Sequence, residues 1–277
     1  MGKMQVGAAI AASFRFVGEA WTKAWGVMLL LVWFTAVLQV VQVLKPTWGF
    51  VTLLGAIPAL FITTAAAGAL YRLRLESDHP GDPDFVAHTG GLQWGALEWR
   101  VMGANILVGV MLGALFILAC FIFGVVLGVT MQSDPADLQA VENGSDAEKL
   151  AALGRLMGGV GGIVSALILI PSLLGLFYLA ARLTVFTPLA ADARSFDLGK
   201  AWALGRGAVL VLILGSLAIY GLEFLVNRLL VAVAGKDWGS AASEVVSAAI
   251  NVPLFAGLVL YVYRAQRGDT AVAATFS

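Results

Sequence analysis

The sequence predicts an all-α fold, a polytopic membrane helix bundle of about six transmembrane helices with interfacial amphipathic helices beside them. Two observations predict it. The 277 residues are 60% hydrophobic and only 12% charged, with a mean hydropathy of +0.90, whereas about a quarter of the residues in soluble domains are charged. The apolar residues are also gathered into six long stretches. We therefore expect a single membrane domain over residues 1–277.

The first expected element is an interfacial helix over residues 6–23. Its large apolar side chains recur at helical spacing, at Ile10, Phe14, Val17 and Trp21. Its charged side chains form a separate stripe, at Arg15, Glu19 and Lys23. A helix with one apolar and one charged face favours the layer of lipid headgroups.

Six stretches are long enough to cross a bilayer, because a hydrocarbon core about 30 Å thick needs about 20 apolar residues in a helix. They are residues 24–44, 50–71, 101–129, 159–186, 208–234 and 241–263. A second amphipathic segment precedes the fifth stretch. Its apolar and charged residues are Phe196, Asp197, Lys200, Trp202, Leu204 and Arg206.

The basic residues predict the orientation, because cytoplasmic loops retain Lys and Arg during insertion whereas acidic residues count for little. Twelve of the seventeen basic residues fall in the terminal segments and in the connections after the second and fourth spans. They are Lys3, Arg15, Lys23, Arg72, Arg74, Arg100, Arg182, Arg194, Lys200, Arg206, Arg264 and Arg267. We therefore expect both termini in the cytoplasm.

The fifth and sixth spans contain polar residues at a depth where ionisable groups are costly. They are Glu223, Asn227 and Arg228 in the fifth span, and Glu244 and Asn251 in the sixth. Antiparallel packing of these spans would place Glu223 by Asn251. It would also place Arg228 by Glu244. Two interpretations stay open: a structural clasp between the helices, or a site that binds a proton or a solute.

Small residues at every fourth position indicate close helix packing in the central hairpin. They are Gly109 with Gly113 and Gly124 with Gly128 in the third span, and Gly154, Gly158, Gly162 and Ala166 leading into the fourth. We expect them to pack this hairpin internally, with homo-oligomerisation as the alternative. The single cysteine, Cys120, lies in an apolar run, and we expect it to be buried.

The connection between the second and third spans contains both histidines, His79 and His88, together with Asp78, Asp82 and Asp84. Their spacing matches no established metal site, and proline and glycine punctuate the segment. We expect a solvated turn and no metal. The sequence also has no nucleophile elbow, Walker loop, dinucleotide fingerprint or zinc motif. We therefore expect no catalytic residue and no cofactor.

One segment carries a resemblance to a known family. It reads Phe186-Thr-Pro-Leu-Ala-Ala-Asp-Ala-Arg194, then Phe196, then Gly199-Lys-Ala-Trp-Ala-Leu-Gly-Arg-Gly207. It resembles a pattern in poorly characterised bacterial six-helix membrane proteins, including the membrane domain attached to some glycerophosphodiester phosphodiesterases and its stand-alone relatives. The resemblance implies the fold and a bacterial inner membrane. It transfers no catalytic residue, because we expect no soluble phosphodiesterase domain in this chain.

The expected function is a non-enzymatic inner-membrane protein with an organising or accessory role. Its basic cytoplasmic side would bind anionic lipid, since each cation near an anionic surface contributes about 1 kcal/mol. The candidate lipid contacts are Arg72, Arg74, Arg182, Arg194, Lys200 and Arg206. Other partners would be membrane proteins or a second copy of the chain, and not nucleic acid, because the charges balance at seventeen basic and seventeen acidic residues. The alternative is a transporter or channel for a small solute or lipid, with its pathway near the fifth and sixth spans.

Overall fold

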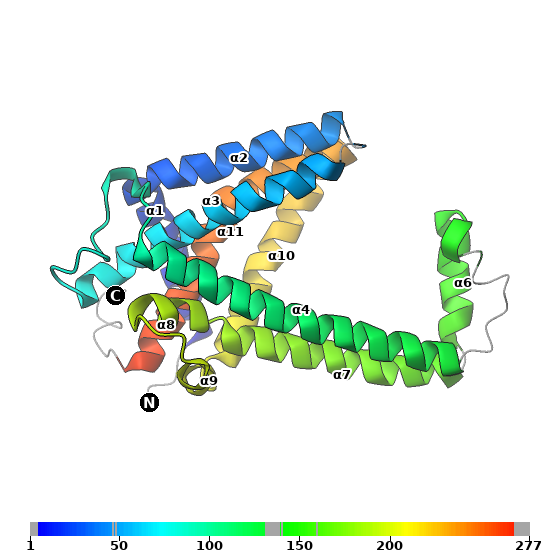
Figure 1. The fold of residues 1–277 in the computed structure, drawn as a ribbon. Helices are drawn as coiled ribbons and strands as arrows, with labels where there is room; N and C mark the ends of the chain where they lie inside the picture. The colour runs from blue at the N-terminus through cyan, green and yellow to red at the C-terminus, as the bar shows by residue number, and fades with distance from the viewer. Residues whose placement is uncertain are drawn as a thin grey trace. The chain divides into compact units, whose positions relative to one another are not determined.

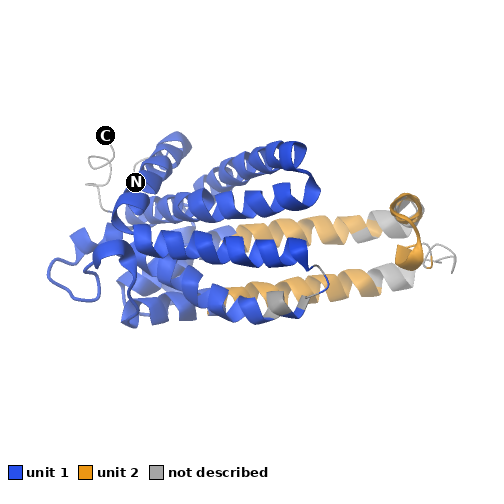
Figure 2. Ribbon diagram, turned by 90° about the horizontal axis from the view of Figure 1, so that it is seen from above, with its two compact units in different colours: residues 1–106, 181–277 blue, residues 107–180 orange. Residues whose placement is uncertain are grey.

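The computed structural model describes residues 5–45, 47, 49–130, 139, 141–158 and 160–268. Its contacts divide the chain into two compact units (Figure 2). Unit 1 comprises residues 1–106 and 181–277, and unit 2 comprises residues 107–180. The single domain expected over the whole chain stays a prediction. Lys3, which we counted among the basic residues, lies outside the described residues.

The described part of the chain is helical (Figure 1). Its α-helices are α1 (Val6–Lys23), α2 (Trp25–Leu44), α3 (Gly49–Leu75), α4 (Ala96–Thr130), α6 (Asp146–Gly158), α7 (Val160–Leu183), α8 (Phe186–Asp192), α9 (Leu198–Gly205), α10 (Val209–Ala234) and α11 (Lys236–Arg267). The short 3-10 helices η1 (Glu76–Asp78) and η2 (Thr89–Gly91) lie between α3 and α4. Six helices, α2, α3, α4, α7, α10 and α11, are long and apolar enough to cross a membrane. This confirms the predicted all-α bundle and makes the chain a multi-pass membrane protein.

Most of the differences from the predicted bounds lie at the charged ends of helices. α4 begins at Ala96 rather than 101, and α11 covers Lys236–Arg267 rather than 241–263. Hydropathy marks only the apolar part of a helix, whereas the backbone hydrogen bonds continue through the flanking polar turns. The bounds of α1 agree with the predicted interfacial helix.

Helix α11 lies at the centre of unit 1, where it packs against α10, α1 and α2. Small residues allow these contacts. A Cβ added at Gly257 of α11 would meet Phe16 of α1 at 3.0 Å, and one added at Gly215 of α10 would meet Leu258 at 2.7 Å. Close backbone approach of this kind supports helix association in lipid, where van der Waals contact must drive it.

The buried face of α1 differs from the apolar stripe that the sequence suggested. The buried residues are Ala9, Ala12, Ser13, Phe16 and Ala20. Phe14 of the predicted stripe is 51% exposed, while Trp21 donates its indole N–H to the Ala249 carbonyl at 2.9 Å. α1 therefore packs a face of mostly small residues against unit 1 and leaves a larger apolar side chain facing outward.

Unit 2 contains α6 and most of α4 and α7. A Cβ added at Gly109, Gly113 or Gly124 of α4 would meet nothing within 4 Å. The expectation that these glycines pack the hairpin internally is therefore wrong, and Gly158 and Gly162 lie outside the residues whose surroundings are described. Cys120 is exposed rather than buried. The hairpin instead carries an apolar cavity of about 290 Å³, lined by Leu112, Phe116, Leu173, Leu176, Phe177 and Ala180.

Candidate functional site

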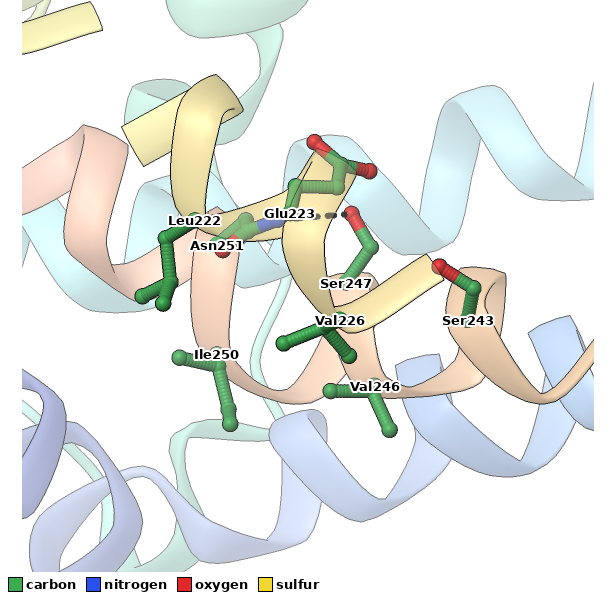
Figure 3. A pocket seen from close by; sticks show the side chains of 8 residues that line it. All are labelled: Leu222, Glu223, Val226, Ser243, Val246, Ser247, Ile250 and Asn251. Carbon is green, nitrogen blue, oxygen red and sulfur yellow. Dashed lines mark hydrogen bonds between the residues drawn. The ribbon is translucent and has the colours of Figure 1, made fainter. Parts of the chain in front are cut away.

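A small cavity with a mostly apolar lining lies between α10 and α11 in unit 1 (Figure 3). Its volume is about 30 Å³. Its polar lining is Glu223 from α10 and Ser243, Ser247 and Asn251 from α11, and its apolar lining is Leu222, Val226, Val246 and Ile250. The three α11 residues recur at every fourth position, so they lie on one face of the helix. Glu223 and Asn251, which the sequence suggested as neighbours, both line this cavity.

The Glu223 carboxylate has no hydrogen-bond or ion-pair partner among the described residues. Glu223 lies near the middle of α10 and is half-buried. In the part of the chain that the structure describes, no hydrogen bond or ion pair reaches it. Asn251 donates from Nδ2 to Ser247 Oγ at 3.2 Å instead (Figure 3). A clasp in which Asn251 holds Glu223 is thus not formed.

Ser243 is the most buried polar residue of the cavity. It is 3% exposed, and among the described residues its hydroxyl has no hydrogen-bond partner. Figure 3 shows the polar ends of Glu223, Ser243 and Ser247 on one side of the helix pair and Val246 and Ile250 on the other. Glu223 and Ser243 therefore line the cavity without a hydrogen-bond partner among the described residues.

The other predicted members of the intramembrane cluster do not join this cavity. Arg228 places its guanidinium over the Phe224 ring, 5.0 Å from the centroid. Glu244 is exposed, and no salt bridge joins it to Arg228 within the described residues. Asn227 is half-buried and does not line the cavity. The expected pair of Arg228 and Glu244 is replaced by a contact within α10, because residues four apart on a helix already face each other.

The size and chemistry of the cavity limit what it can hold. One water needs about 10 to 15 Å³ of such cavity volume, so the space is enough for one or two waters. In the described part of the chain no three His, Cys, Asp or Glu side chains gather closely enough to hold a metal ion. The cavity offers one carboxylate, two hydroxyls and one amide, which are oxygen ligands for a proton, a water or a small hard cation.

Three of the six predicted lipid contacts are held by groups of the protein itself. Arg72, 3% exposed, forms a bidentate ion pair with Glu98, with Nη2 at 2.7 Å from Oε2. Arg74 pairs with Glu19 of α1 at 2.7 Å. Arg182 donates from Nε to the Trp202 carbonyl at 3.0 Å and stacks on the Trp202 ring, 3.6 Å from its centroid.

The other three predicted contacts lie at the surface. Arg194 pairs with Asp82 and is about half exposed. The Lys200 side chain is 69% exposed, 3.5 Å from Asp197, and Arg206 is also exposed. Asp197 caps the N-terminus of α9 by accepting the Lys200 backbone N–H at 2.9 Å. This hydrogen bond holds the pKa of Asp197 below its ordinary value of 3.8.

An ion-pair network that sequence reasoning missed fixes the connection between α3 and α4. Asp192, at the end of α8, accepts hydrogen bonds from Tyr263 Oη at 2.5 Å, from His79 Nε2 at 2.6 Å and from Arg267 Nη1 at 2.6 Å. Asp78 accepts from Arg264 at 2.8 Å. These contacts tie the connection to α8 and to the C-terminal end of α11.

The connection is therefore not the solvated turn that its composition suggested. Phe85 is fully buried, and the His79 ring stacks on it at 4.1 Å between centroids. Arg100 also bridges Asp84 at 2.6 Å and the Ala191 carbonyl at 3.4 Å. One feature of the sequence pointed to this network: the connection contains several aspartates, although it lies on the predicted cytoplasmic side, where basic residues are gathered. This feature does not say which charges pair.

Comparisons with known proteins give no relative for this chain. No family model matches the sequence, no curated protein matches it, and no solved structure matches the fold.

Proposed function

We propose that this chain is a non-enzymatic accessory protein of a bacterial inner membrane, with both termini in the cytoplasm, and that it binds anionic lipid through exposed side chains in and near α1 and α9. The carrying observation is that aromatic and basic side chains are both exposed in these two stretches of the sequence. The exposed aromatic residues are Phe14, Trp25, Phe196 and Trp202, and the exposed basic residues are Lys23, Lys200 and Arg206. Aromatic rings and long cations are the side chains that the headgroup layer favours.

Arg72, Arg74 and Arg182 are weaker candidates for lipid contacts, because groups of the protein hold them. Moving Arg72 to a phosphate would leave Glu98 without its cation, and moving Arg74 would break its ion pair with Glu19. Arg194, Lys200 and Arg206 carry the proposal instead. The resemblance to the membrane domain of glycerophosphodiester phosphodiesterases agrees with it and stays a prediction.

Lipid binding can be measured on the full-length protein in nanodiscs or detergent. Native mass spectrometry would compare how many phosphatidylglycerol and how many phosphatidylcholine molecules stay bound to the protein. We expect a preference for phosphatidylglycerol that falls about 30-fold in the Lys200→Gln/Arg206→Gln double variant, because two cations near an anionic surface contribute about 2 kcal/mol. Lys236→Gln, an exposed lysine at the start of α11, is the matched control. Equal retention of both lipids, or an equal loss in the control, would contradict the proposal.

A second function is supported by the cavity between α10 and α11. A transporter or channel needs water access at this site, whereas a sealed cavity does not. Replacing Glu223 with cysteine in a Cys120→Ala background allows labelling with a membrane-permeant, water-soluble thiol reagent. Labelling in the folded protein favours a hydrated pathway, and complete protection counts against it.

A further inference from the structure

We propose that two copies of this chain associate in the membrane through α10 and α11, with Arg228 of each copy paired to Glu244 of the other. The contact is a homodimer interface with two identical ion pairs. It does not depend on the proposed lipid contacts, which lie in and near α1 and α9. It rests on two opposite charges that have no partner among the described residues, and on where the two helices place them.

Arg228 and Glu244 are exposed side chains of helices that are apolar enough to cross a membrane. Neither forms a salt bridge within the described part of the chain. The Arg228 guanidinium lies over the Phe224 ring instead, 5.0 Å from its centroid. An ionisable group that faces lipid is costly, whereas one that faces protein can be paired. Each of these charges is therefore stabilised by an opposite charge that the described residues do not supply.

Within one chain, the two helices direct these side chains away from each other. Val226 lines the cavity between α10 and α11. Arg228 follows it by two residues, a rotation of about 200° in a helix with 3.6 residues per turn, so Arg228 points away from α11. Glu244 follows Ser243, which lines the same cavity, by one residue, so it lies on the flank of the helix pair. A second copy can bring the two charges together, whereas one chain keeps them apart.

Both charges also lie at a similar depth along their helices. Arg228 comes six residues before α10 ends at Ala234, and Glu244 comes eight residues after α11 begins at Lys236. At 1.5 Å per residue, these positions are about 9 and about 12 Å from the turn that joins the helices. A two-fold axis along the membrane normal keeps every residue at its own depth. Such an axis lets each copy give its Arg228 to the Glu244 of the other, which is the pattern of a closed dimer.

The balance of charge favours a second copy over lipid as the occupant of this surface. A lipid phosphate pairs with Arg228 but repels Glu244, whereas a second copy supplies a partner for both at once. The same two helices carry further half-buried polar residues, namely Glu223, Asn227 and Asn251. Polar side chains of this kind support contacts between helices in lipid.

The experiment measures energy transfer between donor-labelled and acceptor-labelled copies of the full-length protein in phosphatidylcholine liposomes, over a range of protein-to-lipid ratios. We expect the natural protein to form dimers. Arg228→Glu and Glu244→Arg should each weaken self-association at least about tenfold, because each variant places like charges at both contacts. A mixture of the two variants should associate again, because both contacts of the mixed dimer join opposite charges. Lys236→Glu, which reverses an exposed lysine at the start of α11, should leave association unchanged.

Several outcomes would overturn the proposal. They are a natural protein that stays monomeric, an equal loss in Lys236→Glu, or a mixture that associates no better than its two components. A loss in Arg228→Glu without a loss in Glu244→Arg would show that Arg228 binds a lipid phosphate instead. Should circular dichroism show that a reversal variant does not fold, Arg228→Gln and Glu244→Gln decide the question. Association that is unchanged in both of them would also refute the contact.

Discussion

Two carboxylates of unit 1, Glu98 and Glu223, have opposite surroundings. Glu98 is fully buried and accepts hydrogen bonds from both Nη atoms of Arg72 and from the Gly95 backbone N–H at 2.8 Å. Arg72 is fixed in turn, because its Nε donates to the Asp84 carbonyl at 2.8 Å. Glu223 lies in a cavity with no such partner among the described residues.

The difference separates a carboxylate that donors of the protein hold in place from one that has no such donor among the described residues. All the acceptor capacity of Glu98 is directed at groups that the fold holds in place, and its bond to Gly95 also caps the N-terminus of α4. Removing Glu98 therefore disrupts the fold. Removing Glu223 breaks no hydrogen bond or ion pair among the described residues.

The largest expected effect is the loss of Glu98. Glu98→Gln leaves the buried Arg72 charge uncompensated, at a cost of about 3 to 5 kcal/mol in the free energy of unfolding. The double variant Arg72→Met/Glu98→Leu should recover most of this loss, because an apolar pair of similar volume often replaces a buried ion pair at little cost. Equilibrium unfolding in mixed SDS micelles, followed by circular dichroism, measures both.

The matched variant in the cavity is Glu223→Gln. We expect a loss below about 0.5 kcal/mol, and the same for Glu223→Leu, because neither breaks a contact within the protein. A loss of several kcal/mol in the Glu223 variants would show that Glu223 is a structural clasp after all. The contrast with Glu98 would then disappear.

The sequence predicted the helices well because hydropathy is a local property. The spans expected at 24–44 and 208–234 agree with α2 and α10 within one residue. The pairing of charges was not predictable in the same way. Glu98 and Arg72 are 26 positions apart, and Asp192 and His79 are 113 apart. Such pairs depend on the tertiary arrangement, and one sequence has no periodicity that reports it.

In the candidate site, too, some features could be predicted from local patterns in the sequence and others could not. Helical spacing was enough to predict that Glu223 and Asn251 would meet across two antiparallel helices. Ser243 and Ser247 were missed, because serine in an apolar helix usually bonds its own backbone and gives no signal of its own. The span expected at 159–186 stopped at the first residue of α8 (Phe186–Asp192), and this short helix was not predicted.

The next effect in size concerns glycines in the two units. A Cβ at Gly68 of α3 would lie 2.9 Å from Glu98 Cδ, and the ion pair prevents Glu98 from moving away. We expect Gly68→Ala to cost about 1 to 3 kcal/mol. Gly113 of α4 has nothing within 4 Å, so Gly113→Ala should stabilise the helix by about 0.5 to 1 kcal/mol.

Unfolding in mixed micelles measures both alanine variants under the same conditions. A loss in Gly113→Ala that depends on protein concentration would show that this glycine contacts a second copy of the chain. A Gly68→Ala variant as stable as the natural protein would mean that Glu98 is not rigidly held. Either result would change the contrast between the packed polar cluster of unit 1 and the open glycine face of unit 2.

The smallest expected effect belongs to a third kind of carboxylate, the exposed Asp197, whose partner is the Lys200 backbone N–H. This hydrogen bond favours the charged form and lowers the pKa below 3.8, its value in the unfolded chain. The cap therefore contributes stability above about pH 4 and loses it as the pH falls through the lower folded pKa. In ¹⁵N-lysine spectra, the Lys200 amide proton should shift with a midpoint below 3.8. Asp197→Asn should abolish this titration and keep the cap, because asparagine also accepts the N–H; a midpoint at or above 3.8 in the natural protein would show that the hydrogen bond does not form.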